Sequence, residues 1–328
     1  MMSRFILLPM IAITAVLLSQ LPSLSQMGLS ALPLAILLGM VVGHFSCEDV
    51  AELNHKVTLF CQKYCLRFGI ILFGLNLSFQ QIANVGFETL LLNIIVICTV
   101  IAAGLWLGIK VLKLPVDTAI LISAGSAICG AAAVLATDSA IKARQQQVTI
   151  AVATVVLFGT LAMFSYPVIF PHSLMSEQAF GIYIGSTVHE VAQAVAAGQS
   201  ISPEALDNAV VTKLIRVMLL APFILILSAY MTRKAEPEMQ VNTLAVMPWF
   251  ILGFILMTGV NSIFEVPENI LHGASCVSQF LLALAMAALG IQTRLALLKE
   301  AGIKPIIMAL CLFVLLLAGG LFLNRLIV

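Results

Sequence analysis

The 328-residue sequence has few charged side chains and no surplus of basic ones. Only 9% of its residues are Asp, Glu, Lys or Arg, and the formal net charge is +1 at pH 7. Binding to nucleic-acid phosphates requires a clustered excess of Lys and Arg. We therefore expect no nucleic-acid partner.

The sequence also lacks the spacings that mark metal sites, disulfide frameworks and ATP-binding loops. Its seven cysteines are an odd number and include no CxxC or Cys/His ligand spacing, so we predict no metal and no cofactor. The closest pair, Cys61 and Cys65, is predicted to be two buried thiols. No GxxxxGK[ST] loop is present, and a primary pump would need a partner subunit. No acid, base and nucleophile occur together, so we predict that the protein is not an enzyme.

Apolar residues, in contrast, are abundant. They make up 61% of the chain, and the mean hydropathy is +1.11, far above the values of soluble proteins. Apolar runs of about 20 residues without period-2 alternation predict spanning helices rather than a barrel. The run from Phe5 to Leu21 would also suit a cleavable signal peptide, but many similar runs follow it, and we predict a retained first helix.

We predict an all-α integral membrane protein, a polytopic helical bundle with about nine full spans. The expected spans are Phe5 to Leu21, Ser30 to Phe45, Leu66 to Phe79, Phe87 to Ile109, Val148 to Phe170, Ala209 to Tyr230, Val246 to Phe264, Ile270 to Ile291 and Ile306 to Leu323. Residues 1–328 are taken as a single transmembrane transporter domain. Gly39 and Gly43 form a GxxxG contact face, and a second surface of small residues ends at Gly290.

Two further apolar stretches, Thr118 to Thr137 and Phe180 to Gly198, are interrupted by Gly, Ser and polar residues. This pattern is typical of a broken helix or a re-entrant hairpin that lines a cavity, here near residues 118–142 and 178–199. If the first stretch crossed the membrane completely, Lys142 and Arg144 would lie outside, against the positive-inside rule. A hairpin avoids this, and it gives a cytoplasmic amino terminus and a periplasmic carboxyl terminus.

The two interrupted stretches align sixty positions apart, with Gly125-Ser126 over Gly185-Ser186. In the hairpin topology they enter the membrane from opposite sides, as inverted repeats require. Gly74-Leu75-Asn76 and Gly290-Ile291-Gln292 form a second possible pair. Chance similarity between helices rich in small residues is the alternative.

The first interrupted stretch contains Gly125, Ser126, Cys129 and Gly130. Its glycines permit an unwound turn, and a helix that begins there would direct free N–H groups and a positive dipole end toward an anion. Ser126 would add a hydroxyl donor. Close packing of helices is the alternative role for these small residues, and Cys129 has no evident partner for nucleophilic chemistry.

The second interrupted stretch contains Ser186, Thr187, His189 and Glu190 in one apolar run. Ionisable residues within a membrane are costly, so the His-Glu pair predicts function by default. Histidine titrates near neutral pH, and a desolvated glutamate can accept a proton. We predict that His189 and Glu190 carry a coupling proton or position a substrate, unless neighbouring helices simply satisfy them. Ser186 and Thr187 are predicted to bind the substrate.

Lys213 and Arg216 lie three residues apart on one face of the following span. Arg216 is the stronger candidate for an anion because a guanidinium holds an oxyanion in a fixed fork. Lys213 is expected to lie shallower and to extend outward. The structural alternative is pairing with Glu190 or Asp207.

Several stretches of the chain resemble a family, the YeiH-type bacterial inner-membrane proteins. They are Leu32 to Gly43, Leu66 to Gly74, Gly125 to Thr137, Val148 to Thr160, Phe180 to Gly198 and Ala283 to Gly290. The most specific are GSAICGAAAVLAT, Gly125 to Thr137, and GIYIGSTVHEVAQAVAAG, Gly181 to Gly198. The family is classed among proposed sulfate exporters, so the resemblance implies a multi-pass secondary transporter of sulfate or a related anion in the cell inner membrane. It implies no particular site residues.

These patterns lead to one functional hypothesis, an alternating-access exporter of a small anion such as sulfate. Hairpin termini at Gly125, Ser126, Ser186 and Thr187 would hold the anion, Arg216 would supply charge, and His189 and Glu190 would couple transport to protons. A sodium-coupled carrier of organic acids, with Asn76 and unwound carbonyls at the ion, is the alternative within transport. An anion channel and an intramembrane enzyme remain alternatives from other classes. The expected partners are the anion, a proton or sodium ion, the lipid bilayer and a second copy of the chain.

Overall fold

The computed structural model describes residues 3–21, 30–45, 57–232, 249–264, 266–292 and 302–327. Every regular element in these ranges is a helix, so the predicted fold class, an all-α polytopic membrane protein, is confirmed. The chain divides into two compact units. The first holds residues 1–84, 195–203 and 249–294, and the second holds residues 85–194, 204–248 and 295–328.

Six helical segments are long and apolar enough to cross a membrane by length and composition. They are Val57–Asn76, Val85–Val111, Gln145–Ser173, Pro203–Tyr230, Glu268–Ile291 and Ile303–Ile327. Each contains one of the predicted spans or most of it. The remaining three predicted spans correspond to α1 (Ser3–Ser19), α3 (Ala31–Phe45) and α15 (Trp249–Ile263), which have 17, 15 and 15 residues. The start of the last prediction, residues 246–248, lies outside the described residues.

In the first unit, α1 and α3 pack with α16 (Glu268–Gln292), and a segment from η1 (Cys61–Cys65) through α5 (Leu66–Phe73) to η2 (Gly74–Asn76) packs against α15 and α16. Close approach of α3 and α16 depends on glycine. A Cβ atom on Gly290 would lie 2.9 Å from the Met40 nitrogen, and one on Gly43 would lie 2.5 Å from the Ile291 oxygen. The two small-residue faces predicted from the sequence therefore meet each other.

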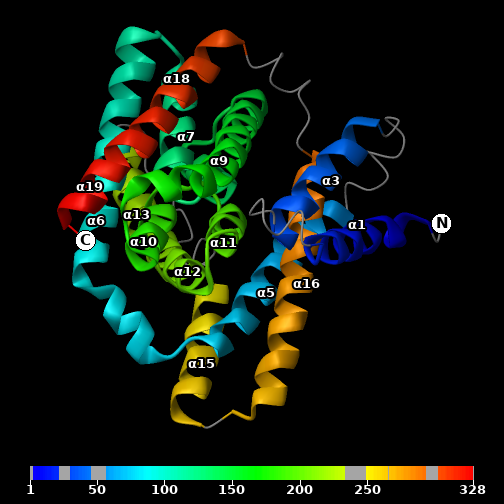
Figure 1. Cartoon of the computed structure of the whole chain (residues 1–328). Helices are drawn as coiled ribbons and strands as arrows, with labels where there is room; N and C mark the ends of the chain where they lie inside the picture. Colours follow the sequence, from blue (N-terminus) through cyan, green and yellow to red (C-terminus); the bar gives the residue numbers. More distant parts are fainter. Residues whose placement is uncertain are drawn as a thin grey trace. The chain divides into compact units, whose positions relative to one another are not determined.

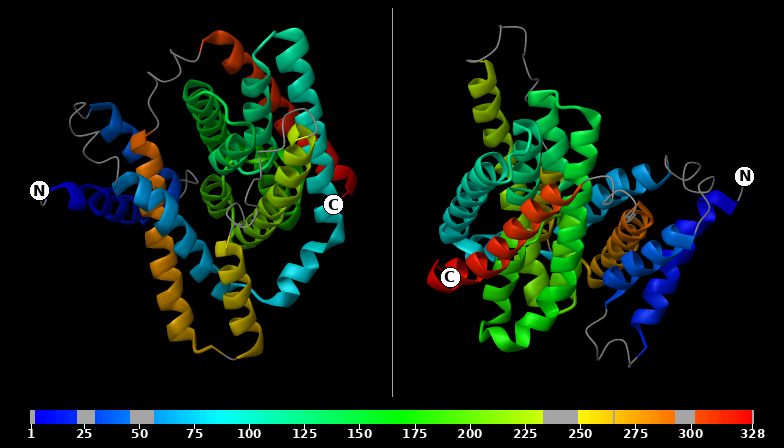
Figure 2. Two further views of the ribbon diagram at one scale, coloured as in Figure 1. Left: turned by 180° about the vertical axis from the view of Figure 1, so that it is seen from behind. Right: turned by 90° about the horizontal axis from the view of Figure 1, so that it is seen from above.

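The second unit contains the interrupted stretches (Figure 1). Its helices are most of α6 (Phe79–Leu105), η3 (Trp106–Val111), α7 (Val116–Ala127), α8 (Ala131–Ile141), α9 (Gln145–Ser173), α10 (Glu177–Thr187), the start of α11 (Val191–Gln199), α12 (Pro203–Met218), α13 (Leu220–Thr232), α18 (Ile303–Val314), η4 (Leu315–Gly319) and α19 (Gly320–Ile327). Helix α18, which precedes η4 and α19, packs against α7 and α9, and Figure 2 shows its course from two further sides.

Both interrupted stretches are broken helices. The first break, residues 128–130, separates α7 from α8, and the second, residues 188–190, separates α10 from α11. The breaks are sixty positions apart, the spacing on which the predicted alignment of repeats depends. After the first break the chain turns back, because a Cβ atom on Gly125 of α7 would lie 2.7 Å from a methyl carbon of Val134 in α8. The fold-back favours the hairpin form of this stretch.

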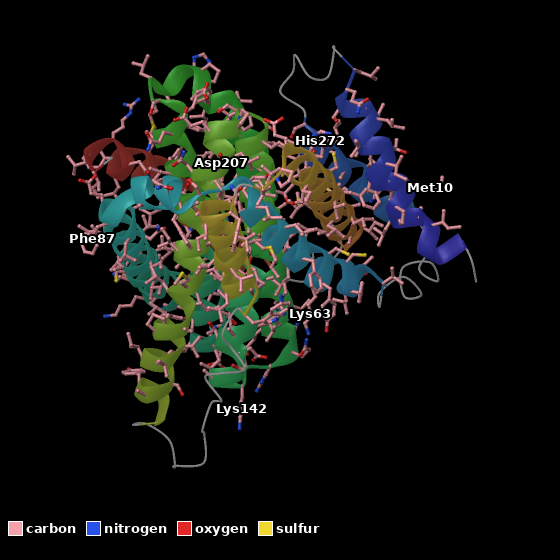
Figure 3. The ribbon with its side chains drawn as sticks, turned by 90° about the horizontal axis from the view of Figure 1, so that it is seen from below. Met10, Lys63, Phe87, Lys142, Asp207 and His272 are labelled. Carbon is pink, nitrogen blue, oxygen red and sulfur yellow. The ribbon has the colours of Figure 1, made fainter. Side chains whose placement is uncertain are left out.

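The predicted topology places the turn after α8 in the cytoplasm, where Lys142 projects away from the helices (Figure 3). Asp207 of α12, predicted to lie outside, is labelled well away from Lys142 in the same view. We expect Ala143→Cys to react with a membrane-impermeant thiol reagent only from the cytoplasmic side, and Glu204→Cys only from the periplasm. The parent chain, with its native cysteines, gives the background. Labelling of Ala143→Cys from the periplasm would restore an eleven-span topology.

Candidate functional site

The two helix breaks are joined by two buried cations of α12, Lys213 and Arg216. The Arg216 Nε atom donates to the Ala127 carbonyl oxygen at 2.7 Å, and Nη2 donates to that of Ser126 at 2.8 Å. Lys213 Nζ donates to the Ile128 oxygen at 3.1 Å. Both side chains also donate to the carbonyl of Val188, in the second break. One pair of cations therefore binds the carboxyl ends of α7 and α10 together.

Helix ends explain why two positive charges are tolerated in this apolar surrounding. The last carbonyl groups of a helix have no partner within the helix, and they carry the negative end of its dipole. Here two such ends converge on the same cations. The hydrogen bonds of Arg216 go to carbonyl groups rather than to Glu190 or Asp207, so the predicted ion pairing is not what holds it. Lys213 is fully buried, and the expectation that it extends outward is wrong.

The hydroxyl groups of Ser186 and Thr187 are engaged within the protein. Both donate to the carbonyl of Tyr183, one turn earlier in α10. They also accept hydrogen bonds, Ser186 from Asn324 Nδ2 at 3.2 Å and Thr187 from the Tyr166 hydroxyl at 2.7 Å. Each hydroxyl has a single proton, so neither can donate to an anion without giving up a bond. Their predicted role in binding stays a prediction.

The amino terminus of α8 receives the carboxylate of Glu190. Glu190 Oε1 accepts a hydrogen bond from the Ala131 nitrogen, over 3.3 Å. The residue before it, Gly130, has φ 73°, a conformation that a residue with a side chain rarely adopts. The two broken segments are thus connected in two ways. Lys213 and Arg216 of α12 bridge their breaks, and Glu190 contacts the amino terminus of α8 directly.

His189, buried next to Glu190, has two ring nitrogens without a hydrogen-bond partner among the described residues. The same is true of the hydroxyl oxygens of Ser126 and Thr212. A buried polar group without a partner costs about 1–3 kcal/mol. These groups lie in or beside the breaks, at Ser126 near the end of α7, at His189 in the second break and at Thr212 adjacent to Lys213. Unused donors and acceptors beside the breaks suit a site that takes a polar ligand. Other described residues with such atoms are Gln62, Asn93, Thr137, Gln199 and Asn324.

Asn76, the predicted coupling-ion residue, belongs to the first unit. Its Oδ1 atom accepts a hydrogen bond from the Ser275 hydroxyl at 2.6 Å, and the next residue, Leu77, receives one from Asn261 Nδ2 at 3.2 Å. The other predicted site residues, in contrast, all belong to the second unit. The predicted role of Asn76 stays a prediction.

Three polar residues of the site region were not singled out in the sequence. Gln193 accepts from the Glu190 nitrogen and donates to the Val156 carbonyl and the Thr160 hydroxyl. Tyr166 donates a hydrogen bond to the Thr187 hydroxyl, and Asn324 donates one to the Ser186 hydroxyl. Gln193 carried a usable signal, as an amide within an apolar run, whereas Tyr166 and Asn324 are brought here only by the packing of α9 and α19.

Close packing of α10 on α12 is required to bring Val188 to the cations. A Cβ atom on Gly185 would lie 2.6 Å from the Thr212 Cβ atom and 3.0 Å from the Lys213 nitrogen. We expect Gly185→Val to force the helices apart and to lower the free energy of unfolding by about 1–3 kcal/mol. Thermal unfolding of the purified protein in detergent measures this. The matched variant Gly319→Val, where a Cβ atom would make only an ordinary contact at 3.4 Å, should change little; equal losses would contradict the packing argument.

The family model described as "Conserved hypothetical protein 698" matches residues 3–309. The "UPF0324 inner membrane protein YeiH" of Escherichia coli K12 is 46% identical over 310 residues, which cover 93% of this chain and 88% of that protein. A UPF0324 membrane protein of Yersinia pestis is 44% identical, covering 92% and 86%, and one of Pseudomonas aeruginosa is 44% identical, covering 95% and 90%. These matches confirm the resemblance to YeiH-type proteins. No solved structure gave a significant match.

Proposed function

The chain belongs to the family described as conserved hypothetical protein 698, and on this premise we propose that it is a secondary active transporter of the bacterial inner membrane that exports a small anion. Sulfate is the first substrate to test, and protons are the proposed coupling ion. The proposed orientation has the amino terminus in the cytoplasm and the carboxyl terminus in the periplasm. The proposed inner-membrane location is supported by the name of the Escherichia coli K12 relative.

One observation carries the proposal, the convergence of two broken helices on two buried cations. Irregular backbone at membrane depth is tolerated only where protein buries it or where it lines a cavity. Broken helices of this kind are a hallmark of secondary transporters, in which helix ends bind substrate and coupling ion near the middle of the membrane. Ionisable residues such as His189, Glu190, Lys213 and Arg216 are costly there and mark transport pathways.

An anion is favoured over a cation by the balance of charge. Lys213 and Arg216 contribute two positive charges around the breaks and Glu190 one negative charge. The amino terminus of α8 adds a partial positive charge and N–H donors. In the proposed site, the anion lies at this helix end near Ser126, while His189 and Glu190 take up the proton.

The decisive experiment is flux of radiolabelled sulfate in proteoliposomes that contain the purified full-length chain. We expect uptake of sulfate above that of protein-free liposomes. An imposed pH gradient, acidic outside the liposomes, should stimulate it several-fold, and a sodium gradient should have no effect. Stimulation by sodium instead, with an organic acid as substrate, would favour the alternative carrier. Flux that follows only the sulfate gradient and membrane potential would favour a channel. Absence of flux for sulfate and for other small anions would refute the proposal.

The coupling role is tested with Glu190→Gln, which keeps the size of the side chain and removes its titration. We expect this variant to lose stimulation by the pH gradient while it retains anion exchange. Glu177→Gln is the matched control, because Glu177 lies in the first turn of α10 but is exposed. Unchanged stimulation in Glu190→Gln would remove Glu190 from the coupling mechanism.

A further inference from the structure

The carboxylate of Glu190 occupies a place that a bound anion would favour. We propose that Glu190 is a tethered competitor of the transported anion, which holds the amino terminus of α8 when the site is empty and leaves it when the anion binds. This inference rests on the proposed function and specifies how its site operates. It makes proton coupling a direct result of competition for one helix end.

The contact that carries the inference is between segments far apart in the sequence. Glu190 Oε1 accepts a hydrogen bond from the Ala131 nitrogen. A Cβ atom on Gly130 would lie 3.1 Å from Oε1 and 3.2 Å from the carboxyl carbon, so the carboxylate packs directly over the residue that precedes α8. A side chain at position 130 would exclude it.

The helix end has no polar side chain of its own to occupy it. Gly130 provides no capping group, and the first turn of α8 is Ala131, Ala132 and Ala133. The first N–H groups of a helix have no partner within the helix, and together with the dipole they form an anion site. Glu190 therefore accepts a hydrogen bond from the first turn of α8 and places negative charge at its positive end, as a substrate carboxylate or sulfate would.

Unused polar groups around the break are the second, independent observation. Both nitrogens of His189 and the Ser126 hydroxyl have no partner among the described residues, and each of these side chains is about 99% buried. The Glu190 carboxylate bonds to the Ala131 nitrogen and leaves these groups without a partner. An oxyanion with several acceptor oxygens would supply partners that the single carboxylate does not reach.

The helix end is also accessible. Ala132 is exposed, and Ala131 and Glu190 are partly exposed, whereas His189, Lys213 and Arg216 are buried. Glu190 is thus less covered by protein than the cations are. A small solute that arrived at this side of α8 would meet the carboxylate before the buried groups, as a competitor requires.

The charged and titratable groups around Glu190 determine the sign of the pH dependence. They are Lys213 from α12, Cys129 from the first break and the adjacent His189. Ionised Glu190 is attracted to the helix end and to Lys213, so it opposes the anion. Protonated Glu190 has no charge and competes poorly. Anion affinity should therefore rise as the pH falls, and anion binding should be accompanied by proton uptake. The proton then moves in the same direction as the anion, so export is driven by the outward anion gradient and the membrane potential rather than by the inward proton gradient.

The test is equilibrium binding of radiolabelled sulfate to the purified full-length protein in detergent, as a function of pH. For the parent we expect the affinity to fall with rising pH, by up to about tenfold per pH unit for one competing proton. Glu190→Gln should bind with an affinity that is nearly independent of pH and equal to or tighter than that of the parent at low pH. Glu177→Gln should behave as the parent. In weakly buffered solution, sulfate should cause proton uptake by the parent but not by Glu190→Gln.

The outcomes separate the inference from the proposed function. If the parent and Glu190→Gln bind sulfate with the same pH dependence, Glu190 is not a competitor, although the protein still binds an anion. A readout that does not require sulfate is thermal unfolding of Glu190→Ala, in gluconate buffer with chloride, nitrate or phosphate added. We expect the anion to raise the unfolding temperature of this variant more than that of the parent, because it fills the vacated helix end. If no anion binds or stabilises either protein, both the inference and the proposed function fail.

Discussion

Replacement of Arg216 by alanine is expected to have the largest effect of any single substitution in the second unit. The change removes the donors to the carbonyl oxygens of Ser126 and Ala127, at 2.8 and 2.7 Å, and one of the two donors to Val188. Two buried carbonyl groups are then left without a partner, at about 1–3 kcal/mol each. We expect Arg216→Ala to lower the free energy of unfolding by about 3 kcal/mol or more and to abolish sulfate flux. Thermal unfolding in detergent and proteoliposome flux provide the two measurements.

Arg216→Lys and Lys213→Met separate charge from geometry. Arg216→Lys keeps the positive charge, but a single ammonium group cannot reproduce the fork that joins Ser126 to Ala127, so it should recover only part of the stability. Lys213→Met removes a charge and leaves Arg216 in place, and we expect a smaller loss of stability with weaker sulfate binding. Unfolding of Arg216→Ala at the parent's temperature would show that the two breaks are held by other contacts.

Replacement of Gly290 by valine is the second change for which we expect a large effect. Gly290 of α16 contacts the main chain of α3, where an added Cβ atom would lie 2.9 Å from the Met40 nitrogen and 3.0 Å from the Gly39 carbonyl carbon. Backbone cannot move aside as a flexible side chain can. The two helices must therefore separate, and close packing is the main force that joins helices in a membrane. We expect a loss of at least about 1–3 kcal/mol, measured as a lower unfolding temperature.

Gly273→Val is the matched control, because Gly273 is in the same helix and a Cβ atom there would meet nothing within 4 Å. Gly273→Val changes the helix propensity of α16 in the same direction as Gly290→Val does, but it leaves the contact with α3 unchanged. Similar unfolding temperatures for Gly290→Val and Gly273→Val would contradict the role assigned to this contact. Gly290 and Gly273 are in the same helix, yet their substitutions have different expected effects, because only Gly290 contacts the main chain of another helix.

Local sequence patterns were sufficient to find the parts of the candidate site. Glycine and serine within apolar runs predicted both broken helices, and the breaks lie at residues 128–130 and 188–190. Lys213 and Arg216 were identified as intramembrane cations from their spacing and surroundings. The partners of these groups could not be predicted, because a main-chain carbonyl has no signature in a sequence. Arg216 was expected to face an anion, but its bonds in this structure go to the carbonyls of α7 and to Val188.

The sequence by itself determined that the protein is a helical membrane protein with two interrupted segments, since hydropathy and glycine placement act locally along the chain. It also determined the family, because the matching residues extend over nearly the whole chain. Only the tertiary structure decided which groups meet. It brought residues 59 positions apart together at Glu190 and Ala131, and it buried Lys213 and Arg216 between two helix ends. The reason is physical: in an apolar medium each polar group must find a partner in space, and the fold determines where that partner is.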